Sequence, residues 1–193
     1  IEYGGDHAKQ VEATAYSTVV SGGPDRKYAF GVCRIEPENN VHMVLEAFAM
    51  EDTLPLVFVG NWNNSEYGSS LREKYSHYPH LWLLDPLYDQ EELNAYRSNC
   101  LLYVHGHSAG GTNPSLVEAM NLGLPILAFD VAYNRETTEN KALYFRTSED
   151  ILKVLEIYCS LNLKQISDNM SEIAKRRYTW DVISQKYAVL FGE

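Results

Sequence analysis

Length, composition and charge limit the classes of protein that this chain can represent. Its 193 residues suffice for one domain or one lobe of a larger protein, and a hydrophobic share of 45% can form a sizeable core. The formal net charge of −10 argues against nucleic acid or an anionic membrane as the main partner, because both bind basic surfaces. Cys33 and Cys100 lie in or beside apolar runs and Cys159 stands apart, which favours thiols in a reducing compartment over disulfides.

The first part of the chain differs from the rest. The chain begins at Ile1 within what reads as a loop, so we expect that sequence is missing before it. We predict that residues 1–27 form a linker and entry segment, with one short strand near 13–20, and that residues 28–193 form the domain. Neither a signal peptide nor a run of about 20 apolar residues is present, so we expect no transmembrane segment.

From Tyr28 onward, short apolar runs alternate with amphipathic stretches. The expected strands are 28–33, 54–59, 80–84, 101–104, 125–129 and 142–145. The expected helices are 41–50, 66–76, 91–98, 114–122, 149–160, 163–177 and 179–191, with 134–140 as a short helix or turn. We expect Trp180 and Tyr187 to pack on the body. The strands are continuously apolar, as in a sheet covered on both faces, so we predict an α/β fold: a doubly wound, Rossmann-like parallel sheet.

The loop from His105 to Asn113 is rich in glycine and leads into a helix with Pro114 in its first turn. Thr112 or Asn113 is the expected N-cap. Free N–H groups and the helix dipole make such a loop an anion site, although a tight connection that merely needs glycines is the alternative. Thr112 and Ser115 can bind phosphate oxygens through their hydroxyl and backbone N–H groups, with helix capping as the alternative. Gly110, Gly111 and Asn113 are further candidate substrate-binding residues in the same loop.

Two charged residues flank the same predicted crevice. Arg34 follows the first strand directly and can bind a phosphate through two parallel hydrogen bonds, unless it pairs with Glu36 or Glu38 on the surface. Glu118 lies one turn inside the helix and can accept hydrogen bonds from sugar hydroxyls. The alternative for Glu118 is a solvated position on the helix surface.

Loops after the other strands supply further candidates. Asn61 lies at the end of the second strand, and Leu87 and Tyr88 follow the third, where they can sandwich a planar base. Trp62 is a similar candidate, and loop packing is the alternative for these aromatic and apolar side chains.

His105 and His107 bracket Gly106 in the central loop. No third ligand has convincing spacing for a metal, so we expect a hydrogen bond to substrate or a structural role. The segment 106–110 also matches the G-x-S-x-G pattern of hydrolases, with Ser108 as the nucleophile. The helix starts several residues after this serine and no histidine follows His107, so a hydrolase is not expected.

Several segments resemble conserved segments of one known family, both in their residues and in their order along the chain. They are IEYGGDH, YAFGVCRIEPENNVHMVLEAF, LPLVFVGN, NPSLVEAMNLGLPILAFD and YTWDVISQKY. From Tyr28 to Phe191 the chain resembles the C-terminal, sugar-nucleotide-binding domain of GT-B-fold glycosyltransferases of family 4. Among these it is most similar to bacterial rhamnosyltransferases of surface polysaccharide synthesis.

The resemblance implies roles for individual residues. Arg34 corresponds to the arginine that contacts the donor diphosphate, and Glu118 to the glutamate that contacts the ribose hydroxyls. The family's lysine falls at Asn39 and its first glutamate at Gly110, so both charges are absent here. Backbone N–H groups of 111–113 would instead contact the diphosphate, and His107 or Asn113 would compensate for the missing carboxylate.

The resemblance implies the donor-binding half of a retaining glycosyltransferase, with Arg34 as its catalytic residue. It would need neither metal nor cofactor and would move a sugar from a nucleoside diphosphate to a polysaccharide or lipid-linked acceptor. Rhamnose from dTDP-rhamnose is one candidate. The acceptor-binding N-terminal domain would lie outside this chain, in a cytoplasmic protein that can touch the inner face of the membrane. The alternatives are a non-catalytic nucleotide-sugar-binding or scaffold module and a GT-B-fold sugar-nucleotide epimerase.

Overall fold

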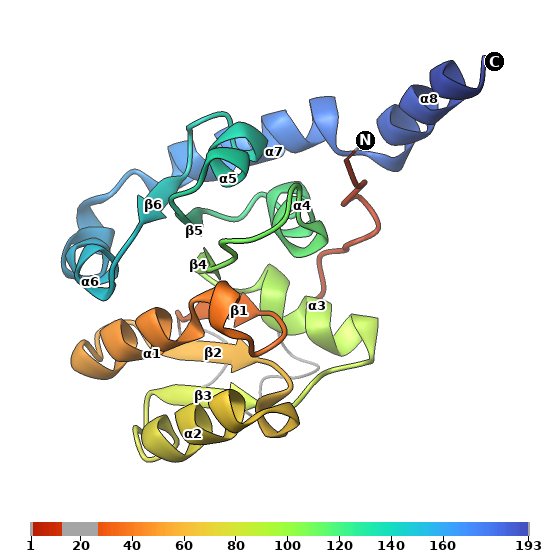
Figure 1. Cartoon of the computed structure of the whole chain (residues 1–193). Coiled ribbons are helices and arrows are strands. Elements are labelled where there is room, and N and C mark those ends of the chain that lie inside the picture. Colours follow the sequence, from red (N-terminus) through yellow and green to blue (C-terminus); the bar gives the residue numbers. More distant parts are fainter. Residues whose placement is uncertain (1, 13–26, 193) are drawn as a thin grey trace.

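A computed structural model describes residues 2–12 and 27–192, so the short strand expected near 13–20 lies outside the described residues. Within them, six parallel strands form one sheet in the order β3-β2-β1-β4-β5-β6 (Figure 1). The strands are β1 (Ala29–Val32), β2 (Leu56–Val59), β3 (Leu81–Leu84), β4 (Leu102–His105), β5 (Ile126–Phe129) and β6 (Leu143–Phe145). This confirms the predicted doubly wound, Rossmann-like sheet.

Strand β1 lies at the point where the strand order reverses. Ala29 pairs in parallel register with Leu56 of β2 and with Leu102 of β4. The chain adds β2 and β3 on one side of β1 and then returns to place β4 on the other side. Segments that leave the carboxyl ends of β1 and β4 therefore diverge and leave a crevice between them.

Helices cover both faces of the sheet. One apolar cluster joins the sheet to α1 (Val41–Met50), α2 (Glu66–Tyr75) and α6 (Ser148–Ile157). A second cluster, on the other face, joins it to α3 (Gln90–Ser98), α4 (Pro114–Asn121) and α7 (Leu163–Arg177). The remaining elements are α5 (Ala132–Thr137), α8 (Trp180–Phe191) and three short 3-10 turns, η2 (Pro37–Asn39), η3 (Trp62–Asn64) and η4 (Tyr158–Ser160). No described helix is long and apolar enough to cross a membrane.

Local capping explains where α4 begins and ends. The Asn113 side chain accepts the N–H of Ser115 at 3.0 Å, so Asn113, and not Thr112, is the N-cap. Pro114 occupies the first helical position, as predicted. After the helix, Gly123 has a φ of 66°, a left-handed conformation that suits glycine. The sequence signals at both ends of this helix are therefore confirmed.

Several predicted bounds need correction. Strand β2 begins at Leu56 and not at residue 54, because Pro55 has no N–H to donate to the sheet. Helix α3 begins at Gln90, since the Asp89 side chain caps it by accepting two backbone N–H groups. The stretch 134–140 contains most of helix α5, and left-handed residues end it.

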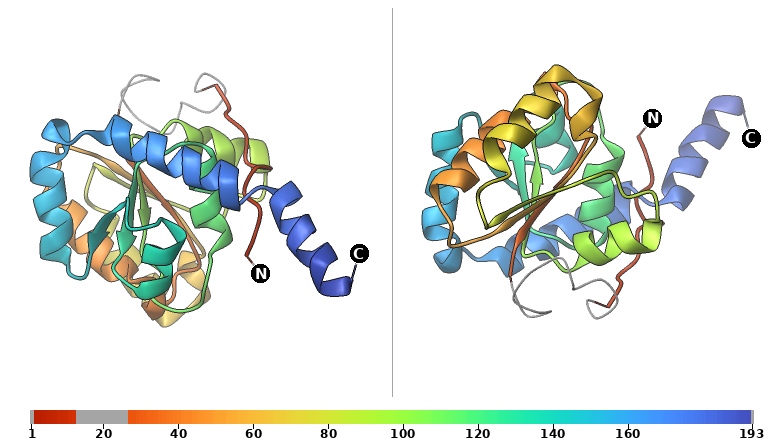
Figure 2. Two further views of the ribbon diagram at one scale, coloured as in Figure 1. Left: turned by 90° about the horizontal axis from the view of Figure 1, so that it is seen from above. Right: turned by 90° about the horizontal axis from the view of Figure 1, so that it is seen from below.

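The N-terminal segment lies against the carboxyl-terminal helices (Figure 2). The Gly5 N–H donates to the Tyr178 carbonyl at 2.7 Å, and Asp6 Oδ1 accepts the Trp180 N–H at 2.8 Å. Helix α8 projects away from the sheet, so Trp180 and Tyr187 are 47% and 45% exposed. Trp180, at the start of the helix, still packs against the N-terminal segment, where its indole nitrogen donates to His7 at 3.3 Å. The expectation that Tyr187 also packs on the body is wrong, because α8 extends beyond the body.

Candidate functional site

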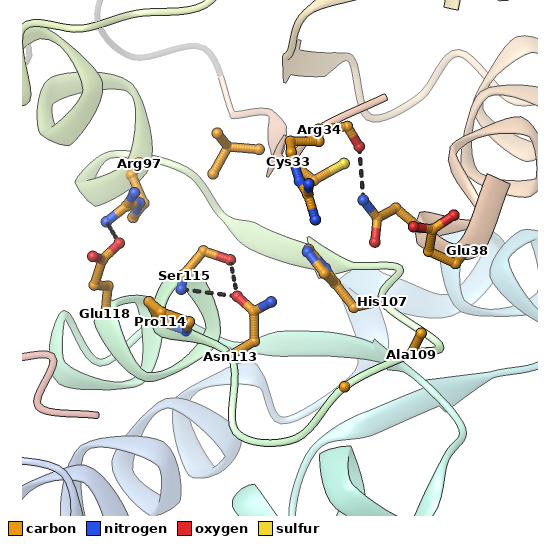
Figure 3. A pocket seen from close by; sticks show the side chains of 13 residues that line it. Cys33, Arg34, Glu38, Arg97, His107, Ala109, Asn113, Pro114, Ser115 and Glu118 are labelled. Atoms are coloured by element: carbon orange, nitrogen blue, oxygen red, sulfur yellow. Dashed lines mark hydrogen bonds and ion pairs between the residues drawn. The ribbon is translucent and has the colours of Figure 1, made fainter. Parts of the chain in front are cut away.

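A cavity of about 540 Å³ opens at the carboxyl ends of β1 and β4 (Figure 3). Its walls come from the end of β1, the η2 turn, the last turn of α3, the loop after β4 and the start of α4. The lining residues are Val32, Cys33, Arg34, Glu38, Asn39, Arg97, His107, Ala109, Gly110, Asn113, Pro114, Ser115 and Glu118. The structure thus brings together residues from these five elements at the predicted edge of the sheet.

Most of the predicted site residues meet at this edge. Six of them line the main cavity: Arg34, His107, Gly110, Asn113, Ser115 and Glu118. Asn61, Leu87 and Tyr88 line a smaller adjoining cavity of about 290 Å³, which shares Arg34 with the main one. Gly111 and Thr112 line neither cavity, because they lie on the outer part of the loop.

Arg34 points into the crevice without an acidic partner among the described residues. Neither Glu36 nor Glu38 forms an ion pair with it, so the alternative of a surface salt bridge is wrong for this structure. Its backbone is held in place by two amide side chains. Asn39 Nδ2 donates to the Arg34 carbonyl at 2.7 Å, and Asn61 Oδ1 accepts the next N–H along the chain at 2.7 Å. The guanidinium is therefore available to an anionic ligand.

The loop after β4 leaves a run of backbone donors free. The N–H groups of residues 110–113 donate to no acceptor in the described part of the chain. Gly110 has a φ of 110°, a conformation that residues with side chains rarely adopt. A carboxylate-bearing residue at this position would therefore strain the loop, which gives a structural reason for the glycine. Free N–H groups next to a helix N-terminus favour an anion.

Ser108 joins this loop to the η2 turn. Its N–H and its hydroxyl both donate to the Glu38 carbonyl at 2.8 Å. The hydroxyl therefore contacts a main-chain acceptor and not a histidine side chain. Asn40 Nδ2 also donates to the Gly106 carbonyl at 2.9 Å, so the two loops form one connected wall of the cavity.

His105 and His107 stack with ring centroids 4.3 Å apart and an interplanar angle of 13°. His105 is 1% exposed, and neither of its ring nitrogens has a hydrogen-bond partner among the described residues. Burial holds the pKa of His105 well below its usual value. Burial and, to a smaller degree, the charge of Arg34 lower the pKa of His107 to about 4. Only His107 reaches the cavity, and it is a neutral imidazole at neutral pH.

These shifted pKa values predict a stability that depends on pH. Below about pH 6.5, the unfolded chain binds more protons at both histidines than the folded chain does. We therefore expect the free energy of unfolding to be largest above this pH and to fall toward about pH 4, by up to about 1.4 kcal/mol per pH unit for each histidine. Urea unfolding at several pH values will show a shallower dependence for His107→Gln. An equal pH dependence of the free energy of unfolding in the two proteins would contradict the lowered pKa of His107.

Glu118 is largely buried, so the alternative of a solvated position on the helix surface is wrong. Its side chain is 14% exposed, and Arg97 Nη1 contacts its Oε2 at 2.5 Å (Figure 3). On the other side, His7 Nε2 lies 2.9 Å from Oε1. Sequence reasoning missed both partners. A signal for Arg97 was present, because it falls four residues after Leu93 on the apolar face of α3.

Trp62 is a core residue and not a base contact. It is fully buried, and its indole nitrogen donates to the Leu84 carbonyl at 2.8 Å. Tyr88, by contrast, is 88% exposed beside the adjoining cavity, where it can contact a planar ligand. Within the described residues, no group of three or more His, Cys, Asp or Glu side chains is placed to hold a metal ion.

The sheet order and the cavity at the strand reversal define a Rossmann-like α/β domain. Residues 18–177 match the family of glycosyl transferases group 1, and the chain belongs to this family. No curated protein matches the sequence significantly.

Solved structures share the fold at low sequence identity. Sucrose-phosphate synthase from Thermosynechococcus elongatus is similar with a TM-score of 0.80 and 17% identity, over 99% of this chain and 52% of that one. Anabaena HepE in complex with UDP is similar with a TM-score of 0.81 and 16% identity, over 99% of this chain and 56% of that one. The C-terminal domain of a Francisella tularensis group 1 glycosyl transferase is similar with a TM-score of 0.72 and 15% identity, over 93% of this chain and 99% of that one. The chain spans about half the length of the first two structures.

Proposed function

We propose that this chain is the donor-binding half of a retaining glycosyltransferase that uses a nucleoside diphosphate sugar. One observation carries the proposal: an unpaired guanidinium, the free backbone N–H groups of Gly110 and Asn113, and a held carboxylate belong to residues that line one cavity. Structures of HepE in complex with UDP and with UDP-glucose support this choice of ligand, since they share the fold. The acceptor-binding domain would lie outside the chain.

The diphosphate would lie between Arg34 and the loop after β4. Arg34 offers a planar pair of donors, and Gly110, Asn113 and the positive end of α4 line the same cavity. When the bond to the sugar breaks, negative charge grows on the diphosphate, and donors already in place stabilise it. Arg34 is therefore the proposed catalytic residue, and we propose that this site acts without metal.

The nucleoside would extend from this point across both cavities. Glu118 would accept hydrogen bonds from the ribose hydroxyls. The adjoining cavity, lined by Leu87 and Tyr88 and by the apolar end of β1, suits a planar base. Asn61 stands at its edge, although its side-chain oxygen already accepts a backbone N–H.

The transferred sugar would face His107 and the glycines of the loop. Gly110 supplies no carboxylate there, and His107 is neutral, so this side of the cavity offers few charged contacts. A 6-deoxy sugar presents one hydroxyl fewer, so we propose rhamnose, from dTDP-rhamnose, as the sugar. The acceptor would be a polysaccharide or a lipid-linked saccharide at the inner face of the membrane.

Calorimetric titration of the chain with UDP, dTDP, GDP, ADP and their sugars tests the proposal. We expect a nucleoside diphosphate to bind and to raise the melting temperature, because ligand that binds only the native state stabilises it. We expect dTDP-rhamnose to bind most tightly. Tighter binding of a UDP- or GDP-hexose would overturn the choice of sugar, and no stabilisation by any of them would favour a scaffold. The chain alone should transfer no sugar. Detectable transfer would contradict the proposal that a separate acceptor-binding domain is needed for activity.

A further inference from the structure

The Glu118 carboxylate is held from two sides by residues far away in the sequence. Arg97 Nη1 lies 2.5 Å from Oε2, and His7 Nε2 lies 2.9 Å from Oε1. We propose that His7 and Arg97 are positioning residues that orient Glu118 toward the sugar hydroxyls of the bound nucleoside. The inference rests on the proposed function and adds to it the N-terminal segment as a working part of the nucleotide site.

Arg97 provides the buried side of this arrangement. Its side chain is 3% exposed at the last turn of α3, and Glu118 is its acidic partner. Its Nε has no hydrogen-bond partner among the described residues, so the bond to Glu118 is the main compensation for a charge taken out of water. The two groups therefore stay together, and the position of one carboxylate oxygen is determined by the core.

His7 provides the outer side, and its tautomer follows from its second contact. Trp180 Nε1 lies 3.3 Å from His7 Nδ1, and an indole nitrogen can only donate a hydrogen bond. His7 Nδ1 must then accept, so the ring hydrogen of the neutral imidazole is on Nε2, which faces Glu118. A hydrogen-bond chain thus runs from the first residue of α8 through His7 to the carboxylate.

The backbone that carries His7 is built into the fold. Gly5 donates its N–H to Tyr178, and a side chain at Gly5 would overlap the carbonyl oxygen of Val117 in α4. Asp6 accepts the Trp180 N–H at 2.8 Å. The segment is therefore anchored to α4 and to α8 within two residues of the histidine, which sets the direction of its ring.

The remaining acceptor capacity of Glu118 matches the ligand. An ionised carboxylate has about four lone-pair positions, and Arg97 and His7 occupy one each. About two positions remain, which suffices for the 2′- and 3′-hydroxyls of a ribose or for the single 3′-hydroxyl of a deoxyribose. Because both oxygens are already held, the carboxylate loses little freedom when the hydroxyls bind, and preorganisation of this kind increases affinity.

The test compares nucleotides that differ only in these hydroxyls. Calorimetry would measure binding of UDP and 2′,3′-dideoxy-UDP, and of dTDP and 3′-deoxy-dTDP (the dideoxy analogue of dTDP), to the unchanged chain and to His7→Ala. We expect His7→Ala to weaken binding of UDP and dTDP by about fivefold and to leave both dideoxy analogues within about twofold, as loss of one hydrogen bond predicts. His7→Gln, which keeps a donor, should restore most of the affinity.

Matched variants separate positioning from folding. His77 is an exposed histidine away from the cavity, so His77→Ala should change none of the four affinities. Trp180→Phe keeps a ring but removes the indole donor, and should produce a smaller loss of the same pattern. Arg97→Lys keeps the charge, and its melting temperature shows whether it still folds. His7 is on the surface side, so its result stands even if Arg97 variants unfold.

Each outcome has one meaning. An equal loss for hydroxylated and dideoxy nucleotides in His7→Ala, or no loss for either, would overturn the role of His7 while leaving the proposed function intact. If the unchanged chain binds GDP or ADP in place of UDP and dTDP, the same comparison is made with that nucleotide and its dideoxy analogue. If it binds none of UDP, dTDP, GDP and ADP, the proposed function and this inference fall together. Selective loss of the hydroxyl-dependent affinity, with recovery in His7→Gln, would establish the positioning role.

Discussion

Replacing Arg34 with alanine will weaken binding of UDP or dTDP by roughly a hundredfold, about 2.7 kcal/mol, and will leave binding of the free nucleoside nearly unchanged. The reason is that Arg34 is the cavity residue that combines positive charge with no acidic partner among the described residues. A bidentate, charge-assisted contact with phosphate is among the stronger hydrogen-bonding interactions in proteins. Calorimetry with the diphosphate and with the nucleoside separates the two contributions.

Two further variants control this result. Arg34→Lys keeps the charge but not the planar pair of donors, so its diphosphate affinity should fall between those of the unchanged chain and the alanine variant. Arg176 is a half-exposed arginine of α7 that pairs with Glu139, so Arg176→Ala should not affect the affinity. A similar loss for diphosphate and nucleoside in Arg34→Ala would show that the change disturbs the cavity as a whole, and Arg34 would then not be the phosphate ligand.

Replacing Gly106 with alanine will lower the free energy of unfolding by about 2 kcal/mol. A side chain at this position would overlap the carbonyl oxygen of Asn39, and backbone atoms cannot rotate away as a flexible side chain can. The loop after β4 would have to separate from the η2 turn, where Ser108 and Asn40 make their hydrogen bonds. Urea unfolding monitored by circular dichroism measures the change.

Gly111→Ala is the matched control for this prediction. A side chain at Gly111 would meet no atom within 4 Å, and its φ is not in the left-handed region. We expect its stability to stay within about 0.5 kcal/mol of the unchanged chain, as for most surface substitutions. Nucleotide affinity should fall in Gly106→Ala, since the same loop carries the free N–H groups. Equal stability of the two variants would contradict close packing of the loop against the turn.

The strand pattern was predictable because the four central strands are buried on both faces. Continuous apolar runs such as those of β2 and β5 indicate parallel strands covered by helices, and the structure confirms them. The ends of α4 were predictable for a local reason as well. Each signal acts within a few residues of its own position. The Asn113 side chain caps the start of the helix, Pro114 fills its first position, and Gly123 follows its end in a left-handed conformation.

The partners of individual side chains were not predictable in the same way. Trp62 follows a strand as a base-binding residue would, yet it lies in the core because η3 turns its ring inward toward Phe58. Glu118 has the sequence position of a solvated helix residue, but Arg97 of α3 lies against it. Neither position leaves a local signature around the residue concerned, since Leu84, which accepts the Trp62 indole N–H, and Arg97, which pairs with Glu118, come from other parts of the chain.

The sequence by itself determined the order and type of the main elements, the edge of the sheet where the cavity opens, and Arg34 as a cationic residue that lines it. Those features depend on hydrophobic periodicity and on residues next to strand ends. Only the tertiary structure decided that His7, Arg97 and Trp180 converge on Glu118. These residues are separated by between 21 and 173 positions, so their approach depends on how the N-terminal segment, α3 and α8 pack around α4.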